Sequence, residues 1–140
     1  MSKILKMSDR IKIKVGKTTF IIGPLNQMQK IELSECTKMA PGGEEVYDLS
    51  RAQVLLIKYG LKGLEGVTDA HGDPYKLEFE NDILTDDCLS EVFTLEARAE
   101  YLTAAWQCLN NLPDKITDPV TGKKMKGVAL ELVPKKVQDG

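Results

Sequence analysis

Residues 49–59 constrain the fold more than any other segment, because they predict a helix with apolar side chains on nearly every side. One face carries apolar residues at three- and four-residue spacing: Leu49, Ala52, Leu55, Leu56 and Tyr59. A second face carries Val54 and Ile57, and Leu61 follows the helix. Such a helix lies at the centre of a core, or it faces the core on one side and a partner on the other. We therefore regard Val54, Ile57 and Leu61 as candidate protein-binding residues, with burial in the core as the equal alternative.

Residues 10–22 predict a β-hairpin. Apolar and basic side chains alternate over residues 10–15, which places Ile11 and Ile13 on one face and Lys12 and Lys14 on the other. A turn at Gly16 leads into the β-branched and aromatic residues 18–22. An isolated hairpin is only marginally stable in water. Its apolar face must therefore pack on a helix or on the sheet of another copy.

Three further segments predict helices. Asn26 is a suitable N-cap for residues 27–39, with Gln29 completing a capping box. Thr85 is a suitable N-cap for a short helix ending near Phe93. Residues 95–109 repeat apolar side chains every three or four positions, which predicts a regular amphipathic helix. Gly60 follows the apolar helix at the place where a left-handed capping residue is common.

The 140 residues predict one domain, because this length is close to the usual size of a single core. We expect residues 1–9 and 134–140 to be frayed, and residues 40–47 to form a mobile loop, since they contain Pro and two Gly. Residues 128–132 alternate in polarity, which predicts either a short strand or a tail that becomes ordered on binding. The predicted fold class is therefore α+β: a predominantly helical single domain with about four helices, an N-terminal β-hairpin and that short C-terminal strand.

Charge is unevenly distributed although the formal net charge is only -2. Residues 1–40 carry eight Lys or Arg and three Asp or Glu, whereas residues 41–100 carry five and fourteen. These segments attract each other within one protomer or between copies, or they are simply solvated surfaces. The near-neutral total does not favour nucleic acid or an anionic membrane as a partner. No run approaches the ~18 apolar residues of a membrane span, so we expect a cytoplasmic protein.

The reactive side chains do not form a recognisable catalytic or metal-binding pattern. Cys36, Cys88 and Cys108 have no CxxC or zinc-finger spacing, which fits a reducing compartment, and we expect Cys88 and Cys108 to be buried. His71 is the only histidine, so a nucleophile paired with histidine would depend on it alone. We therefore expect no enzymatic activity, and we predict no catalytic, cofactor-binding or metal-binding residues.

Four local motifs have a functional and a structural interpretation. Gly16 begins a Gly-Lys-Thr sequence, but a phosphate-binding loop needs glycine at the position of Ile11, so a hairpin turn is favoured. The alternating Asp and His residues of 69–73 are typical of turns and too few for a calcium loop. Lys12 and Lys14 fit an edge strand protected against aggregation better than a nucleic-acid site, which would need aromatic residues nearby.

The densest acidic tract is the fourth motif, and it consists of Glu78, Glu80, Asp82, Asp86, Asp87 and Glu91. General acid and base catalysis needs carboxylates in an enclosed site with separated pKa values, which an exposed strand and helix start do not supply. Contact with a basic partner surface is the more credible use. We include Glu78, Glu80 and Asp82 among the candidate protein-binding residues.

Residues 61–69 read Leu-Lys-Gly-Leu-Glu-Gly-Val-Thr-Asp, and residues 71–74 read His-Gly-Asp-Pro. This stretch resembles the pattern Trp-x-Gly-Val-x-Asp-x-x-Gly-x-Pro of the tail assembly chaperones of long-tailed bacteriophages and prophages, with Leu64 where that family often has Trp. The order of predicted elements over residues 10–110 is similar as well. The resemblance implies a non-enzymatic protein of the host cytoplasm that binds the helical tape measure protein, keeps it soluble and helps to gather tail tube subunits.

Two other functions remain open at this point. The hairpin, which needs a cover, also suits a structural phage protein such as a tube, terminator or head-tail joining subunit. A small nucleic-acid-binding regulator that uses Lys12 and Lys14 is a third alternative. The apolar helix and the hairpin together make a homo-oligomer a reasonable expectation for any of the three.

Overall fold

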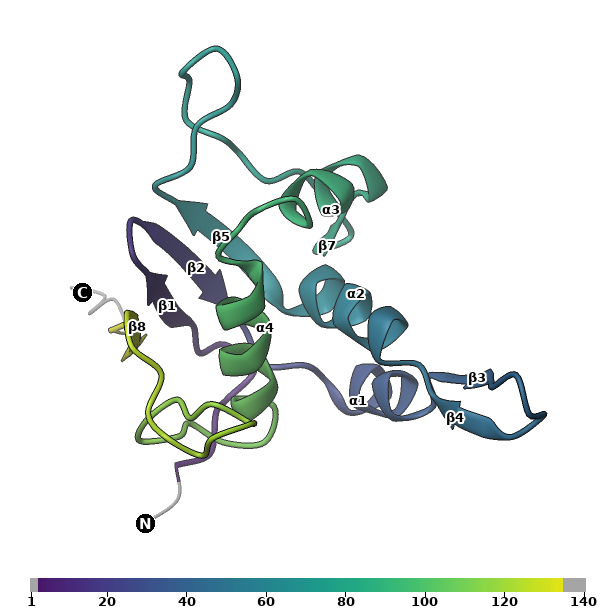
Figure 1. Ribbon diagram of the computed structural model, residues 1–140. Helices are drawn as coiled ribbons and strands as arrows, with labels where there is room; N and C mark the ends of the chain where they lie inside the picture. The colour runs from purple at the N-terminus through teal and green to yellow at the C-terminus, as the bar shows by residue number, and fades with distance from the viewer. Residues whose placement is uncertain (1–2, 135–140) are drawn as a thin grey trace.

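A four-stranded antiparallel sheet forms one side of the protein in the computed structural model, which describes residues 3–134 (Figure 1). The strand order is β5-β2-β1-β8. The bounds are β1 (Ile11–Val15), β2 (Thr18–Ile22), β5 (Leu61–Glu65) and β8 (Val128–Leu132). The sheet therefore joins segments from the beginning, the middle and the end of the chain.

The N-terminal hairpin has the strands that the sequence predicts. Ile11 pairs with Ile22 and Val15 pairs with Thr18 around Gly16, whose φ of 60° suits the turn. Ile11, Ile13 and Phe20 are buried on one face. Helix α4 (Arg98–Gln107) covers this face, and the rings of Phe20 and Tyr101 stack with centroids 4.6 Å apart. The cover that the hairpin requires thus comes from its own chain.

The protein is not predominantly helical, and that part of the predicted fold class is wrong. Its described residues contain four helices, but strands occupy about as many residues as helices do. The predicted helix over residues 27–39 ends early, as α1 (Gln27–Ser34), after the predicted Asn26 capping box. Its last residues form β3 (Thr37–Met39), which pairs with β4 (Glu45–Tyr47). Residues 40–47, predicted to be a loop, therefore include a strand of a projecting hairpin (Figure 1).

Helix α2 (Leu49–Gly60) lies at the centre of the helical layer. It contacts elements on several sides: α1, α3 (Asp86–Val92), α4, β5 and β7 (Ile83–Leu84). Ile57 and Leu61 are 0% exposed, and Val54 is half-buried against the core. The second apolar face of this helix is thus largely core, because the segment after β5 folds back over it. Of the two interpretations of Ile57 and Leu61, burial in the core is therefore the one that the structure shows.

The segment between β5 and α3 is mostly irregular. Over residues 75–80 only β6 (Phe79–Glu80) forms a strand, and it pairs with β7. Asn81 and Asp82 connect the two strands with positive φ angles of 54° and 64°, as in a tight hairpin turn. The carboxylates of Glu78, Glu80 and Asp82 lie exposed on or beside this small hairpin.

The two ends of the described chain make contacts with the rest of the fold. The Leu112 amide donates to the Lys3 carbonyl, and the Val133 amide donates to the Arg10 carbonyl. Residues 1–2 and 135–140, parts of the predicted frayed ends, lie outside the described residues. Among residues 3–134, no helix has both the length and the apolar character needed to cross a membrane.

Candidate protein-binding groove

An open groove of about 500 Å³ runs between α2 and α4. Leu56 and Leu102 are buried side chains that line it from the two helices. Leu49 and Trp106 line it as well, and they are 54% and 40% exposed. Large apolar side chains that remain in water beside a concave apolar surface are typical of a protein-binding site.

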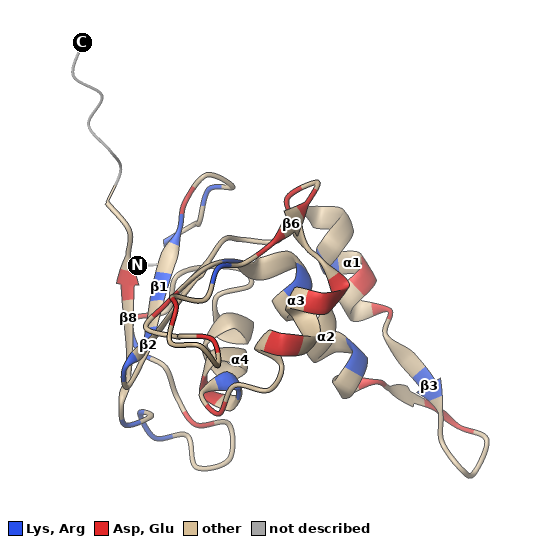
Figure 2. Ribbon diagram, turned by 90° about the horizontal axis from the view of Figure 1, so that it is seen from above, with Lys and Arg blue, Asp and Glu red and all other residues tan. Residues whose placement is uncertain are grey.

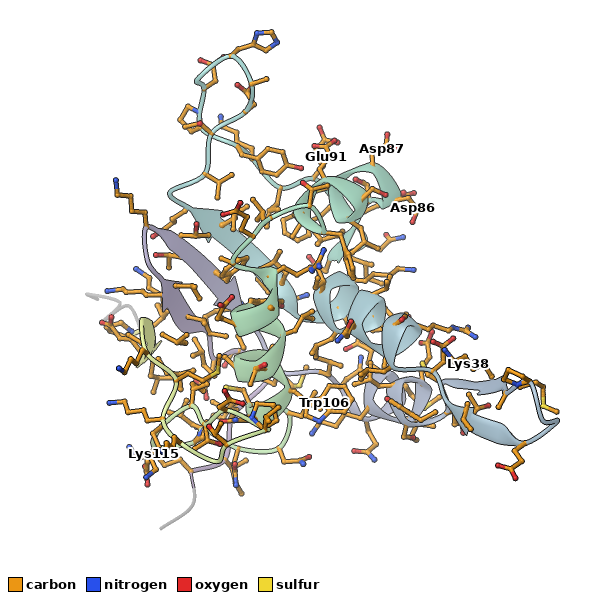
Figure 3. The ribbon with its side chains drawn as sticks, viewed as in Figure 1. Lys38, Asp86, Asp87, Glu91, Trp106 and Lys115 are labelled. Atoms are coloured by element: carbon orange, nitrogen blue, oxygen red, sulfur yellow. The ribbon has the colours of Figure 1, made fainter. Side chains whose placement is uncertain are left out.

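The ends of α2 and α4 explain why these two residues are exposed. Leu49 is the first residue of α2, directly after the Asp48 cap that accepts a hydrogen bond from the Arg51 amide. Trp106 lies near the end of α4, on the side toward α1 (Figure 3). Each of the two side chains therefore lies at an end of its helix, outside the packed core.

The side chain of Gln107 at the groove is held by hydrogen bonds. Gln107 donates from Nε2 to the Thr117 carbonyl at 2.8 Å and accepts from the Thr117 amide at 3.3 Å. These bonds hold the segment after α4 against the helix and bring Pro119 to the groove. This wall of the groove is already ordered before a partner binds. Binding therefore does not carry the free-energy cost of ordering the wall, which would lower the affinity.

A second hollow of about 200 Å³ lies on the other side of Trp106. Leu33 of α1, Leu109 after α4 and Tyr47 of β4 line it. The Tyr47 hydroxyl donates to the Leu33 carbonyl at 2.7 Å, which fixes this ring at the base of the β3–β4 hairpin. Trp106 therefore stands between two apolar hollows. Tryptophan is enriched among the residues that contribute most to binding at interfaces.

The groove does not contain the binding residues that the sequence predicts. Ile57 and Leu61 pack in the core, Val54 is half-buried against it, and the acidic residues gather on β6–β7 and α3 (Figure 2). Leu49 and Trp106 belong to apolar stripes that are expected to face the core. The only signal for Leu49 is its place next to a capping residue, where the first turn of a helix is often left uncovered. No feature of the sequence around Trp106 indicates that its side chain is exposed.

No ion pair among the described residues joins the basic segment of residues 1–40 to the acidic segment of residues 41–100. Within residues 3–134 the one ion pair joins Lys14 to Glu131 at 3.2 Å, between neighbouring strands. It does not link the basic first segment to the acidic middle segment. The acidic residues around β6 and α3 are exposed, and the Glu91 carboxylate accepts a hydrogen bond from the Tyr75 hydroxyl at 2.7 Å (Figure 2).

The turn over residues 68–74 has the local bonds that favour a structural interpretation. One side-chain oxygen of Asp69 accepts from the amides of His71 and Asp73, at 2.8 and 3.1 Å. His71 is exposed at this turn. Among the described residues, no group of three or more His, Cys, Asp or Glu is placed to hold a metal ion.

All three cysteines are buried and free, as the sequence predicts for Cys88 and Cys108. Burial raises the pKa of Cys108 to about 12. Burial is also the main cause that raises the pKa of Cys36. A nucleophilic cysteine instead needs a lowered pKa and access to solvent. These two thiols are therefore suited to packing.

We expect the native protein to react slowly with an aromatic disulfide reagent at pH 8. Thiolate is the reactive form of cysteine. Burial disfavours the thiolate and also blocks the access of the reagent to the sulfur atom. Absorbance of the released thiol should report three reactive groups in denaturant and a rate at least ~100-fold lower without it. Rapid native reaction of even one thiol would contradict the burial described above.

Comparisons with protein-family models, with curated proteins and with solved structures give no match for this chain.

Proposed function

We propose that the protein is a non-enzymatic tail assembly chaperone of a long-tailed bacteriophage, and that it binds an apolar helical segment of the tape measure protein in the groove between α2 and α4. The observation that carries this proposal is the exposure of Leu49 and Trp106 beside the buried Leu56 and Leu102. A helix with apolar residues at i, i+3 or i+4, and i+7 fits such a groove.

The motif that resembles the chaperone family has a definite place in the fold. Its first five residues form strand β5, which follows directly from α2. Its Gly66 approaches the backbone at Lys17, and its Asp69 closes the following turn. The motif therefore lies directly after the helix whose beginning lines the groove. This connection between the resemblance and the groove favours the proposal.

The binding energy follows from the apolar area that a partner would cover. Each square ångström of apolar surface removed from water contributes roughly 25 cal/mol. A tryptophan at the centre of a contact is among the residues whose truncation weakens binding most. We therefore expect Trp106 to contribute most to affinity and Leu49 to contribute less.

Co-expression with the tape measure protein encoded beside this chain tests the proposal. The two proteins should elute together in size-exclusion chromatography. Trp106→Ala and Leu49→Asp should each weaken binding in titration calorimetry by at least about tenfold. Aspartate is compatible with the first turn of a helix, so Leu49→Asp should leave the fold intact.

Val120→Ser is the matched control, because Val120 is 89% exposed and is not part of either hollow. It should bind like the unaltered protein. Separate elution of the two proteins at every salt concentration would contradict the proposal, and so would equal affinity of the control and the Trp106 variant.

A structural tail or head-tail joining subunit is the second candidate. The projecting β3–β4 hairpin and the outer edges of β5 and β8 favour it, because assembling subunits use such elements to add strands to one another. Mass spectrometry of purified virions distinguishes the two functions. A structural subunit remains in the particle, whereas a chaperone of this kind is absent from it.

A further inference from the structure

The hydroxyl group of Tyr101 has no hydrogen-bond partner among the described residues. The residue is 0% exposed on α4, and within residues 3–134 its Oη is the one buried side-chain oxygen or nitrogen without a partner. Burial raises the pKa of this phenol, so the group stays protonated and able to donate. A buried hydroxyl without a partner is costly, and native proteins rarely keep one.

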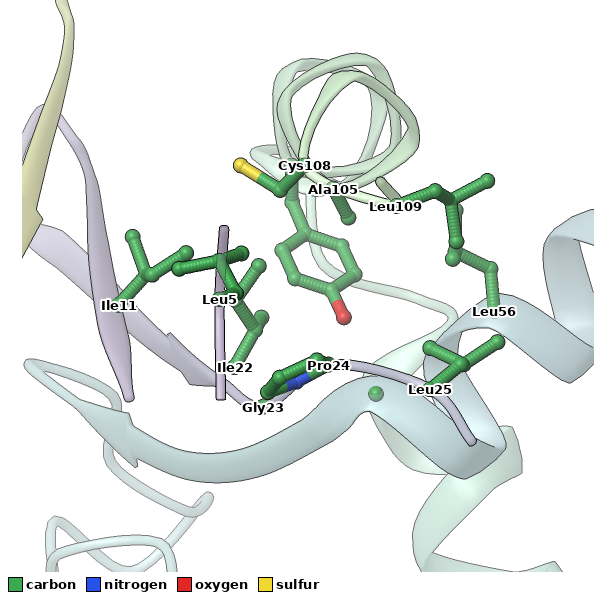
Figure 4. A pocket seen from close by; sticks show the side chains of 12 residues that line it. Leu5, Ile11, Ile22, Gly23, Pro24, Leu25, Leu56, Ala105, Cys108 and Leu109 are labelled. Atoms are coloured by element: carbon green, nitrogen blue, oxygen red, sulfur yellow. The ribbon is translucent and has the colours of Figure 1, made fainter. Parts of the chain in front are cut away.

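A small cavity of about 10 Å³ adjoins the ring of Tyr101. Its wall combines the N-terminal segment, the sheet, α4 and the connection between β2 and α1 (Figure 4). Gly23, Pro24 and Leu25 form one side, while Ala105 and Cys108 of the α4 region lie opposite (Figure 4). This volume is close to that of a single water-sized sphere.

Gly60 lines this cavity, and its lack of a side chain leaves the space free. Its backbone conformation does not require glycine. Its φ is outside the left-handed region, contrary to the capping role expected from the sequence. A Cβ on Gly60 would lie 3.5 Å from Leu25 Cδ1, 3.7 Å from Tyr101 Oη and 3.9 Å from the Gly23 carbonyl oxygen. A methyl group on Gly60 would therefore fit without a clash. It would occupy space next to the Tyr101 hydroxyl oxygen and the Gly23 carbonyl oxygen.

We infer that the cavity holds one structural water molecule, which bridges Tyr101 and Gly23. The Tyr101 hydroxyl donates to the water oxygen, and the water donates to the Gly23 carbonyl. The Gly23 amide already donates to the Gly60 carbonyl at 2.9 Å. The water therefore connects α4 to the point where the end of α2 meets the end of β2. Leu56 separates this water from the groove, since it lines both spaces.

The sign of one stability change tests the inference. If the water is present, Tyr101→Phe removes a satisfied hydroxyl and should lower the melting temperature by about 2–6 °C. If the cavity is dry, the same substitution removes an unsatisfied hydroxyl and should raise the melting temperature. An increase, or no change, would overturn the inference.

Gly60→Ala distinguishes a bridging water from a direct bond between Tyr101 and the backbone. The added methyl group should displace the water and leave the Tyr101 hydroxyl unpaired. Gly60→Ala should therefore lower the melting temperature more in the unaltered protein than in the Tyr101→Phe variant. Melting temperatures of the two single variants and the double variant measure this coupling. Equal effects of Gly60→Ala in both backgrounds would show that no water links the two sites.

Oxygen-17 magnetic relaxation dispersion gives a direct count of long-lived internal water. The count should fall by about one molecule in Tyr101→Phe and in Gly60→Ala, with unchanged far-ultraviolet circular dichroism. Gly72→Ala is the matched control, because the surroundings of Gly72 are open and it does not line this cavity. A count equal to that of the unaltered protein in both cavity variants would overturn the inference.

Discussion

Ile57→Asp is expected to leave the protein largely unfolded at 25 °C. Ile57 is 0% exposed in a helix that contacts neighbours on several sides, so the new carboxylate would be buried away from water. Burial of an unpaired charge together with the loss of an apolar side chain costs more than about 4–5 kcal/mol. This is comparable to the whole stability of a typical domain. Far-ultraviolet circular dichroism and urea titration measure the loss.

Leu49→Asp, in the same helix, is the matched comparison for folding. Leu49 is 54% exposed at the first position of α2, where a negative charge interacts favourably with the helix dipole. This variant should remain folded with a change of no more than about 1 kcal/mol. If Ile57→Asp were equally well folded, the second face of α2 would be a surface after all, and Ile57 would again be a candidate contact residue.

Gly66→Ala is expected to have the second-largest effect on stability. Gly66 has a φ of +79°, and a Cβ there would lie 2.0 Å from the Lys17 carbonyl oxygen. The left-handed conformation alone costs an alanine about 1–2 kcal/mol. The contact is with backbone, so β5 must also move away from the β1–β2 turn. We expect a total loss of at least about 3 kcal/mol in chemical denaturation.

Gly72→Ala separates backbone strain from the close approach. Its φ of +85° is similar, but no atom lies within 4 Å of the Cβ position. The expected loss is therefore only the conformational part, about 1–2 kcal/mol. Equal losses for the two variants would mean that Gly66 does not approach Lys17 as closely as described. The glycine of the chaperone-like motif would then have no packing role.

The elements that the sequence predicts well are those with strong local patterns. Alternation over residues 10–22 and a glycine at the turn define β1 and β2 before any distant contact forms. Side-chain caps likewise define where α1 and α3 begin. In each case the physical cause lies within a few residues of its effect, so it can be read from the chain.

Pairing with distant partners explains the errors in the fold. Strand β5 has two lysine or glutamate residues, a glycine and no β-branched residue, and it is a strand because β2 offers it an edge to pair with. The sequence predicts helix at β3 because nothing in its three residues outweighs the preceding helical pattern. Its partner β4 and the Cys36–Asp48 backbone bond determine its conformation.

The candidate site is harder to predict than the fold, because exposure depends on what covers each face. A periodic apolar pattern indicates that a face is buried somewhere, and it does not distinguish the residues at the margin from those at the centre. Leu49 and Trp106 belong to the same stripes as Leu56 and Leu102. Only the positions of α1, α2 and α4 relative to one another separate the two pairs.

The β3–β4 hairpin has a practical consequence for following this protein in experiments. Its tip carries Gly42 and Gly43, and at both positions an added Cβ would have no neighbouring atom within 4 Å. A short epitope or a fluorophore attached there would extend from the tip of a hairpin that projects away from the sheet (Figure 1). Such a label at the hairpin tip offers a way to follow the association that we propose for the α2–α4 groove, without a change to the residues that line it.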